Sequence, residues 1–377
     1  MPLRISAPLS QAEAFVSPGA PPSSSTELLW YKMRVVFWPW LLLFFALVTS
    51  SWSLSSDGQA LLALSRNLTL PSSIRSNWSV SDATPCTWYG VGCNGRNRVV
   101  SLDLASSGVS GSLGPEICHL KYLQTLILSD NNISGSIPPE LGNCSMLEQL
   151  DLSQNLLSGV LPDSIGNCTK LEDLYLYDNQ LSGSLPATLG KIKGIRNFDA
   201  TTNGFTGEIT FSFENCKLEI FILSFNNIEG EIPSWLENCR SLTQLGFVNN
   251  KMSGKIPTSL GLLSNLTYLL LSENSLSGPI PPELGNCRLL QWLELDANQL
   301  EGTVPKELAN LRSLSKLFLF ENRLVGEFPE TIWSIPTLES VNLGSNRLSG
   351  SIPSGIANCQ SLKRLILRDN NFSGSIL

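Results

Sequence analysis

Residues 121–144 read KYLQTLILSDNNISGSIPPELGNC, and residues 145–168 repeat this pattern as SMLEQLDLSQNLLSGVLPDSIGNC. Leucine, asparagine, glycine and proline stand at matching places in the two stretches, 24 residues apart. Twelve such units follow one another from Val99 to Leu377, and only the unit that begins at Ile195 is one residue short. A single unit of this length holds too little apolar surface for a core, so the units must stack into one solenoid.

Each place in the repeat has a physical role. Alternating leucines such as Leu126 and Leu128 predict a short strand with its leucines inward, and successive strands should pair as a parallel sheet on a concave face. The asparagine present in eleven units, for example Asn131, should bond the backbone of neighbouring coils. Glycine permits the turn, and the following Ile-Pro excludes a long helix on the convex side. The expected fold class is an α/β solenoid that winds as a right-handed superhelix.

Composition excludes several kinds of protein. Charged residues make up only 15% of the 377 residues, which is too little for a disordered chain. The net charge of -7 argues against a nucleic-acid partner, because phosphate recognition needs a basic face. We see no nucleophile paired with a base and no phosphate-binding loop, and His119 is the only histidine. No catalytic residue, metal or cofactor is therefore expected.

The first 53 residues have the composition of a targeting region. Lys32 and Arg34 precede an apolar run from Val35 to Val48, and small residues follow it, so residues 33–53 are predicted to be a secretory signal peptide. A membrane anchor would need about 20 apolar residues, and Pro39 interrupts this shorter run. Residues 1–32 show no periodicity and are interpreted as disordered or as an upstream extension.

Glycosylation signals agree with a secreted route. Seven asparagines begin an Asn-x-Ser/Thr sequon and are candidate glycosylation sites: Asn67, Asn77, Asn132, Asn143, Asn167, Asn265 and Asn371.

The nine cysteines fall into three groups. Cys86 and Cys93 lie just before the first repeat and are expected to form a disulfide within an amino-terminal cap, residues 54–98. Cys118 has no assignment. The other six share one repeat phase that leucine or isoleucine fills elsewhere, so they are predicted to be buried free thiols: Cys144, Cys168, Cys216, Cys239, Cys287 and Cys359.

The units of the form LxGxIP, which fill residues 99–377 with the last one incomplete, follow the motif CTWYGVGC at residues 86–93. Together they resemble the ectodomains of plant leucine-rich-repeat receptor kinases. Segments 56–67, 81–93, 106–117 and 361–371 look most like receptors of endogenous Pep danger peptides. The resemblance implies a right-handed leucine-rich-repeat superhelix at the cell surface, a secreted peptide ligand and a co-receptor kinase of the somatic-embryogenesis type.

Such a resemblance also implies a transmembrane helix and a cytoplasmic Ser/Thr kinase. The sequence to Leu377 holds no VAIK, HRD or DFG motif and no apolar span after the repeats. We therefore expect no enzyme activity in this chain, a membrane link only through a missing segment, and a truncated product at the cell surface or in the apoplast.

Ligand contacts are expected at the outward positions of the strands, which vary between units. These positions are mostly acidic and aromatic, which favours a basic, extended peptide. Arg364 resembles the arginine that meets the ligand's carboxylate in Pep receptors, although Phe318 and nearby Lys316 stand where that family has an acidic partner. The candidate ligand-binding residues are Asp173, Tyr175, Tyr177, Asp199, Phe225, Tyr268, Trp292, Glu294, Asp296, Phe318, Phe320, Arg364 and Arg368.

Two readings of function stay open. The first is a peptide-binding receptor ectodomain for defence or peptide-hormone signalling, with a truncated decoy as its variant. The second is a secreted leucine-rich-repeat protein that inhibits a pathogen's wall-degrading enzyme. Inhibitors of this kind have similar repeats, and a second cysteine pair caps the end of their repeat array.

Overall fold

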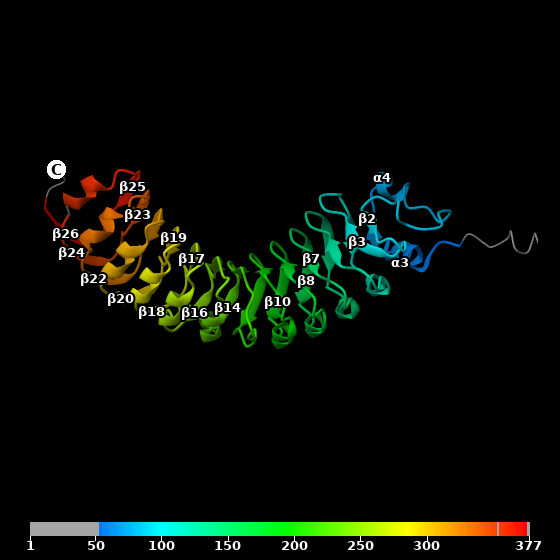
Figure 1. The fold of residues 1–377 in the computed structure, drawn as a ribbon, viewed down its shortest axis with the longest axis horizontal. Coiled ribbons are helices and arrows are strands. Elements are labelled where there is room, and N and C mark those ends of the chain that lie inside the picture. Colours follow the sequence, from blue (N-terminus) through cyan, green and yellow to red (C-terminus); the bar gives the residue numbers. More distant parts are fainter. Residues whose placement is uncertain (1–52, 353, 375–377) are drawn as a thin grey trace, which may run out of the picture. The chain divides into compact units, whose positions relative to one another are not determined.

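The computed structural model describes residues 53–352 and 354–374. The expected extension at residues 1–32 and nearly all of the expected signal peptide lie outside the described residues. From Leu54 onward the chain forms one compact unit of stacked coils that curves into an arc (Figure 1). The coils confirm the predicted solenoid.

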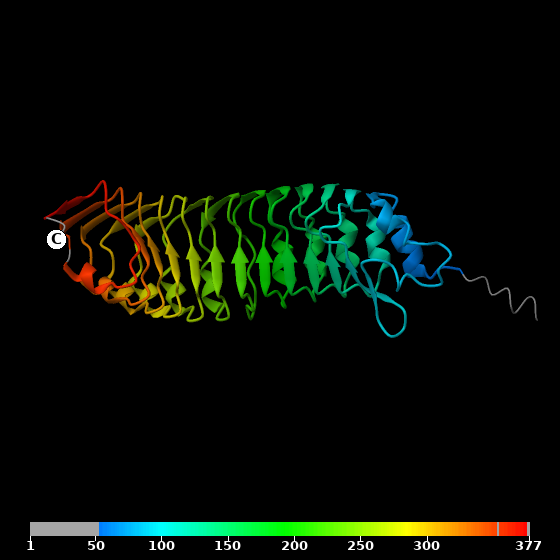
Figure 2. The same cartoon turned by 90° about the horizontal axis from the view of Figure 1, so that it is seen from above.

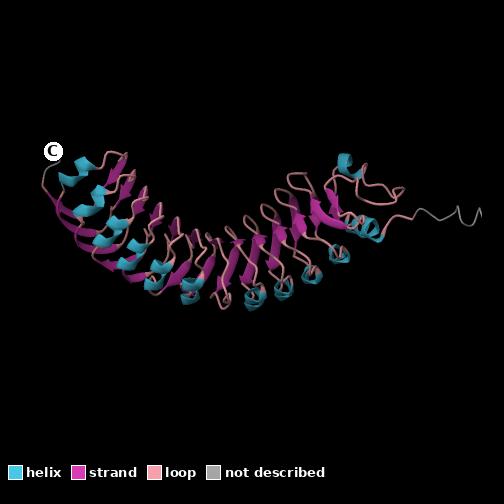
Figure 3. Cartoon of the chain, in the orientation of Figure 1, coloured by secondary structure: helices cyan, strands magenta, loops and turns pink. Residues whose placement is uncertain are grey.

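The concave side of the arc is a sheet of thirteen strands in sequential order (Figure 3). All neighbours pair in parallel except β2 and β3, which are antiparallel. In the three-residue strands from β5 to β23 the central residue is buried in the core, as Leu150 and Leu174 are. The strands are β2 (Val91–Cys93), β3 (Val99–Asp103), β5 (Thr125–Ile127), β7 (Gln149–Asp151), β9 (Asp173–Tyr175), β11 (Asn197–Asp199), β13 (Ile220–Ile222), β15 (Gln244–Gly246), β17 (Tyr268–Leu270), β19 (Trp292–Glu294), β21 (Lys316–Phe318), β23 (Ser340–Asn342) and β25 (Arg364–Ile366).

A second layer of strands, which the repeat pattern did not predict, follows in each coil. It comprises an eight-stranded and a five-stranded sheet, and glycines with positive φ, such as Gly135 at +81°, lie in or beside its strands. The strands are β1 (Leu68–Thr69), β4 (Ser110–Ser112), β6 (Asn132–Gly135), β8 (Leu156–Val160), β10 (Gln180–Ser184), β12 (Gly204–Gly207), β14 (Asn227–Glu231), β16 (Lys251–Ser253), β18 (Ser277–Pro279), β20 (Gln299–Gly302), β22 (Arg323–Glu327), β24 (Arg347–Ser351) and β26 (Asn371–Ser373).

Short 3₁₀ helices line the convex side of the arc (Figure 1), whereas Figure 2 looks onto the concave strands. Each spans five residues, and most begin directly after the proline of the repeat, as η3 does after Pro138 and η4 after Pro162; proline removes a helical hydrogen bond and so favours such short helices. They are η2 (Pro115–His119), η3 (Pro139–Asn143), η4 (Asp163–Asn167), η5 (Ala187–Lys191), η6 (Ser234–Asn238), η7 (Thr258–Leu262), η8 (Pro282–Asn286), η9 (Lys306–Asn310), η10 (Glu330–Ser334) and η11 (Ser354–Asn358).

The asparagine column forms the predicted ladder between coils. The Asn131 amide nitrogen donates to the carbonyls of Leu104, Leu128 and Ser129, and its oxygen accepts from the Val109 N–H of the preceding coil. The same four-bond pattern recurs at Asn226. Each amide therefore satisfies backbone groups of two adjacent coils.

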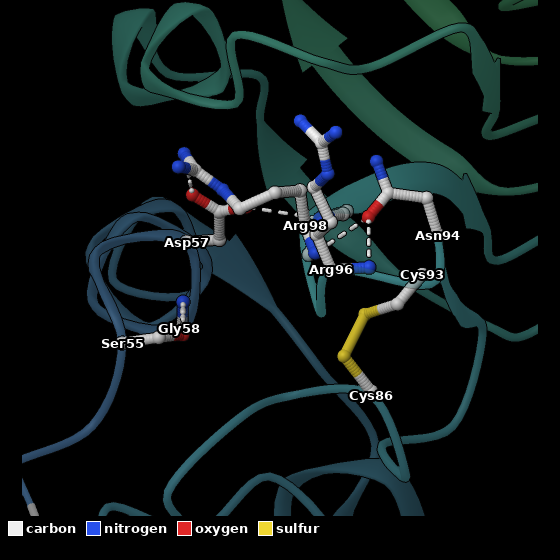
Figure 4. The surroundings of a disulfide bond; sticks show 9 residues. Ser55, Asp57, Gly58, Cys86, Cys93, Asn94, Arg96 and Arg98 are labelled. Atoms are coloured by element: carbon white, nitrogen blue, oxygen red, sulfur yellow. Dashed lines mark hydrogen bonds and ion pairs between the residues drawn. A yellow bond between two sulfur atoms is a disulfide. The ribbon is translucent and has the colours of Figure 1, made fainter.

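An amino-terminal cap covers the first coil. It contains α3 (Ser56–Leu64), α4 (Ser72–Arg75) and a disulfide between Cys86 and Cys93 (Figure 4). Asp57 is 1% exposed, yet its carboxylate accepts two bonds from the Arg98 guanidinium and one from the Val99 N–H. This ion pair, in which only Asp57 is buried, fastens the helix of the cap to β3.

The prediction of six free thiols is wrong for one pair. Cys216 and Cys239 form a disulfide, whereas Cys144, Cys168, Cys287 and Cys359 are free and buried. Equivalent side chains of regular coils point the same way, so their sulfurs do not face each other. Cys216 lies in the coil that is one residue short. This coil has Thr210 in place of proline and no 3₁₀ helix between β12 and β13, and Cys216 itself is only half-buried.

Burial keeps the thiols of these four free cysteines unreactive. It raises the pKa of Cys144 to about 12 and those of Cys168 and Cys287 to about 11, and it also raises the pKa of Cys359. Cys118, left unassigned by the sequence, is a free, half-buried thiol at η2 that packs against the core.

Candidate ligand-binding face

The outward side chains of the concave sheet form parallel rows. Because the strands pair in register, the first residue of each strand lies beside the first residue of the next, as Asp173 does beside Asn197. Strands lie about 4.8 Å apart, so the eight steps from β9 to β25 extend about 38 Å along the sheet. The structure therefore spreads the candidate residues along a long surface instead of gathering them in one pocket.

An acidic cluster occupies strands β7 to β11. In register, Tyr175 lies between Asp151 and Asp199, and the Asn197 amide donates to the Asp173 carboxylate at 2.7 Å. Burial raises the pKa of Tyr175, and the negative charges of Asp173, Asp151 and Asp199 raise it further. No described Lys or Arg forms an ion pair with these carboxylates. The cluster thus has uncompensated negative charge.

Burial also acts on Asp199, the acid on the last strand of this cluster. It raises the pKa of Asp199, although hydrogen bonds from the Thr201 hydroxyl and N–H offset part of the effect. Tyr177 and Asp178 follow β9 directly and extend the cluster; Tyr177 is half-buried, and Asp178 is exposed with a φ of +53°.

An aromatic cluster occupies strands β17 to β21. The rings of Tyr268 and Trp292 meet edge to face with centroids 5.0 Å apart, and the Lys316 ammonium lies 3.3 Å from the centroid of the Trp292 ring. This cation–π contact covers part of the indole that the sequence predicted to be free. Phe318 lies beside Glu294 in register, and Phe320 follows β21 and is half-buried.

The two acids of this region differ in exposure. Glu294 is half-buried; burial raises its pKa, and so does Asp296, while Lys316 lowers it. Asp296 is only 6% exposed and accepts a 2.6 Å bond from the Ser272 hydroxyl, so most of its carboxylate is covered by the protein itself.

Apolar side chains that sequence reasoning missed connect the two clusters. Ile220, Ile222, Val248 and Leu270 occupy outward positions between β13 and β17 and are half-buried. Repeat phase could have found them, because they stand at the same places as the acids and aromatics. Phe225 borders this apolar strip on the turn after β13, where it is 49% exposed and has a φ of +55°.

Two arginines lie at the far end of the face. Arg364 begins β25 and Arg368 follows that strand, and both are exposed. Arg368 has a carboxylate oxygen of Asp369 at 3.7 Å, whereas no described carboxylate lies within ion-pair distance of Arg364. The described face is thus negative around β9 and positive at β25.

Within the described residues, no group of three or more histidine, cysteine or carboxylate side chains could hold a metal ion. No helix in that part of the chain has both the length and the apolar character needed to cross a bilayer.

Comparison with protein families agrees with the coil architecture. The leucine rich repeat N-terminal domain matches residues 54–94, and leucine rich repeat families match residues 121–181, 217–239, 265–287 and 337–359. The chain is therefore a leucine-rich-repeat solenoid with an amino-terminal cap of this kind.

Its curated relatives are plant leucine-rich-repeat receptor-like kinases and related repeat proteins. The chain is 48% identical to a receptor-like protein kinase of Ipomoea nil over 81 residues, which are 21% of this chain and 7% of that protein. It is 46% identical to the receptor-like protein kinase PEPR1 of Arabidopsis thaliana over 92 residues, which are 22% and 8%. The matches thus span less than a tenth of the length of either kinase.

Solved ectodomains match more of the chain. The chain is 38% identical to PEPR1 in its complex with AtPEP1, with a TM-score of 0.54. The match covers 84% of this chain and 55% of that one. The Arabidopsis receptor kinase HAESA, in complex with the peptide hormone IDA and the co-receptor SERK1, is 30% identical with a TM-score of 0.64, covering 84% and 54%. The chain spans about half the length of these ectodomains.

Proposed function

We propose that the concave face binds an extended, basic peptide whose free carboxylate meets Arg364. The main support for this proposal is the acidic cluster of Asp151, Asp173, Asp178 and Asp199. No described Lys or Arg forms an ion pair with any of these four carboxylates. Positive side chains of a guest would lower the electrostatic cost of keeping these acids charged beside Tyr175.

The layout of the face also gives the peptide a direction. Its basic residues contact β7 to β11, its apolar residues contact the strip around Ile220 and Leu270, and its carboxyl end points toward β25. An extended chain rises about 3.3 Å per residue, so about 12 residues cover the distance from β9 to β25. Arginine suits the carboxylate end because its guanidinium offers two parallel donors.

The peptide-binding relatives support a role as a receptor ectodomain. The PEPR1 structure is a complex with AtPEP1, and the HAESA structure is a complex with a peptide hormone and a co-receptor. We infer that this chain is presented on the extracellular side, that residues 33–53 direct it there, and that a co-receptor kinase of the somatic-embryogenesis type joins the complex. Defence signalling is the biological setting we propose.

The seven sequon asparagines fit this extracellular setting. All seven are exposed in the described part of the chain. We propose that they carry N-glycans, which mass spectrometry of the secreted protein would detect.

The test uses a synthetic peptide of about 12 residues, the length that spans the face, with lysines in its first half and a free carboxylate. Calorimetry should show binding that weakens about a hundredfold or more in the Asp173→Asn/Asp199→Asn variant, because two charge-assisted hydrogen bonds are lost and each contributes about 1.5–3 kcal/mol. The carboxyl-terminal amide of the peptide should bind the wild type less tightly, and Arg364→Gln should remove that preference.

Glu229→Gln/Glu301→Gln is the matched control, since it removes two exposed carboxylates from the second strand layer. Equal affinities for this control and for the Asp173→Asn/Asp199→Asn variant would contradict a specific role of the acidic cluster.

A further inference from the structure

The amino-terminal cap holds two adjoining pockets that lie outside the proposed peptide site. The first, about 760 Å³, is lined by α3 and by the segment after η2, with Arg66, Arg98, His119, Lys121 and Tyr122 among its residues. The second, about 690 Å³, is lined by Asn94, Gly95 and Arg96 and shares Arg98 and Tyr122 with the first. The two pockets therefore form one surface divided by the Arg98 and Tyr122 side chains.

This surface is basic in a chain whose net charge is -7. Arg66, Arg96 and Lys121 are exposed, and none of them has a described carboxylate within ion-pair distance. The nearby Asp57 does not neutralise them, because it is buried and already bound to Arg98. Each pocket thus offers at least one cation that no group of the protein compensates.

The partition between the pockets is held in place before any ligand arrives. The Arg98 guanidinium donates to both oxygens of Asp57 and lies 4.7 Å from the centroid of the Tyr122 ring. The Tyr122 side chain is 44% exposed. Figure 4 shows Asp57, Arg98, Arg96 and Asn94 close together beside the disulfide of Cys86 and Cys93. Little side-chain ordering would therefore be needed for binding.

Polar groups around the cations suit a hydroxylated ligand. The Asn94 amide oxygen accepts from the N–H groups of Arg96 and Arg98, which leaves its NH₂ group without a described acceptor. Gln59 and Ser56 line the other pocket; the Gln59 amide nitrogen donates to the Leu54 carbonyl and the Ser56 hydroxyl donates to Asp57, so their oxygens remain as acceptors. A sugar ring presents hydroxyls to such groups and an apolar C–H face to a tyrosine ring, whereas a purely apolar ligand would leave them unpaired.

We propose that the two pockets bind an acidic oligosaccharide that carries a carboxylate on successive sugars, a uronic-acid oligomer. One carboxylate contacts Arg66 and Lys121, the carboxylate of the next sugar contacts Arg96, and the bond between the two sugars crosses the Arg98 and Tyr122 partition. A single small anion would fill only one of the two pockets, which is why the repeated anion is the better fit.

The experiment titrates the folded chain with an oligomer of galacturonate at low salt. Arg66→Gln/Lys121→Gln should weaken binding at least about tenfold, since it removes two charge-assisted contacts. Lys251→Gln/Lys306→Gln is the matched control, because it removes the same charge from exposed lysines of β16 and η9 and should bind like the wild type. Raising the salt concentration should weaken wild-type binding.

Three outcomes would overturn the proposal. They are equal affinity of the two double variants, equal affinity for the methyl-esterified oligomer, and affinity for inorganic polyphosphate as high as that for the galacturonate oligomer. The Asp173→Asn/Asp199→Asn variant should retain oligosaccharide binding, so failure of the peptide proposal would leave this test unaffected.

Discussion

At the scale of the residue, one repeat phase holds the asparagines that bond adjacent coils, and another holds cysteines in two chemical states. Asn131 and its equivalents recur at one phase beside apolar positions, and a buried amide there must find backbone partners. Cys216 and Cys239 occupy the same phase as four free thiols, so phase alone could not separate them. The difference arises from the shape of one coil.

Asp57 provides a residue-scale prediction about pH. Burial by itself raises the pKa of this carboxyl, but the bonds from Arg98 and Val99 and the Arg98 charge outweigh it and leave the pKa below its ordinary 3.8. The group therefore stabilises the fold fully above about pH 4, and this contribution falls as pH decreases through the lowered pKa of the folded state. Asp57→Asn should cost about 1–2 kcal/mol at neutral pH, because it weakens hydrogen bonds to a charged acceptor whose partner, the Arg98 side chain, is 35% exposed and screened by water.

Thermal unfolding of the wild type and Asp57→Asn between pH 2 and 7 measures this effect, and the window follows from the lowered pKa. The difference between the two proteins should shrink below pH 4. Taking the difference cancels the opposite contribution of Asp199 and Glu294, whose pKa values are raised. A constant difference across the range would show that the Asp57 charge does not stabilise the fold.

At the scale of the element, the sequence predicted the concave strands, the glycine turns and the absence of long helices. It did not predict the second strand layer. Strands such as β6 (Asn132–Gly135) contain one buried residue, Ile133, among exposed ones, and this is too short an alternation to distinguish a strand from a loop. Their pairing depends on the neighbouring coil, which a local pattern does not show.

The irregular coil supplies an element-scale prediction. It lacks the 3₁₀ helix that packs neighbouring coils together, and the Cys216–Cys239 disulfide links it to the next coil across 23 positions. A cross-link of this loop length stabilises by about 3 kcal/mol. Cys216→Ala/Cys239→Ala should lower the free energy of unfolding in urea by about that amount more than Cys144→Ala/Cys168→Ala does.

The second variant is a matched control, because Cys144 and Cys168 also stand in consecutive coils but are free. Equal losses in the two double variants would mean that the disulfide adds no stability beyond packing of its sulfur atoms.

At the scale of the whole molecule, the solenoid could be read from the repeat, and so could the rows of the concave face. The sequence did not show which acidic and aromatic side chains remain accessible to a ligand. Ser272 covers Asp296 and Lys316 covers Trp292, and both contacts join neighbouring coils. The basic cap surface was also missed, because its residues come from separate segments and share no repeat phase.

Stability in such an array is a sum of coil terms and nearest-neighbour terms. Asn226→Ala removes four hydrogen bonds between and within adjacent coils. We expect amide hydrogen exchange to accelerate in residues 195–250 while α3 in the cap keeps its protection. Asn227→Ala, at an exposed neighbouring position, should leave exchange unchanged. Uniform acceleration along the described chain would instead indicate a single cooperative unit.

The two reversed strands contributed by the cap have a consequence for self-association. β1 (two residues) and β2 (three residues) close one edge of each strand layer with a short antiparallel ribbon. Open sheet edges attract strands of other molecules, and very short edge strands offer few main-chain groups for such pairing. At this boundary the chain protects itself against fibre-like stacking of one molecule on another.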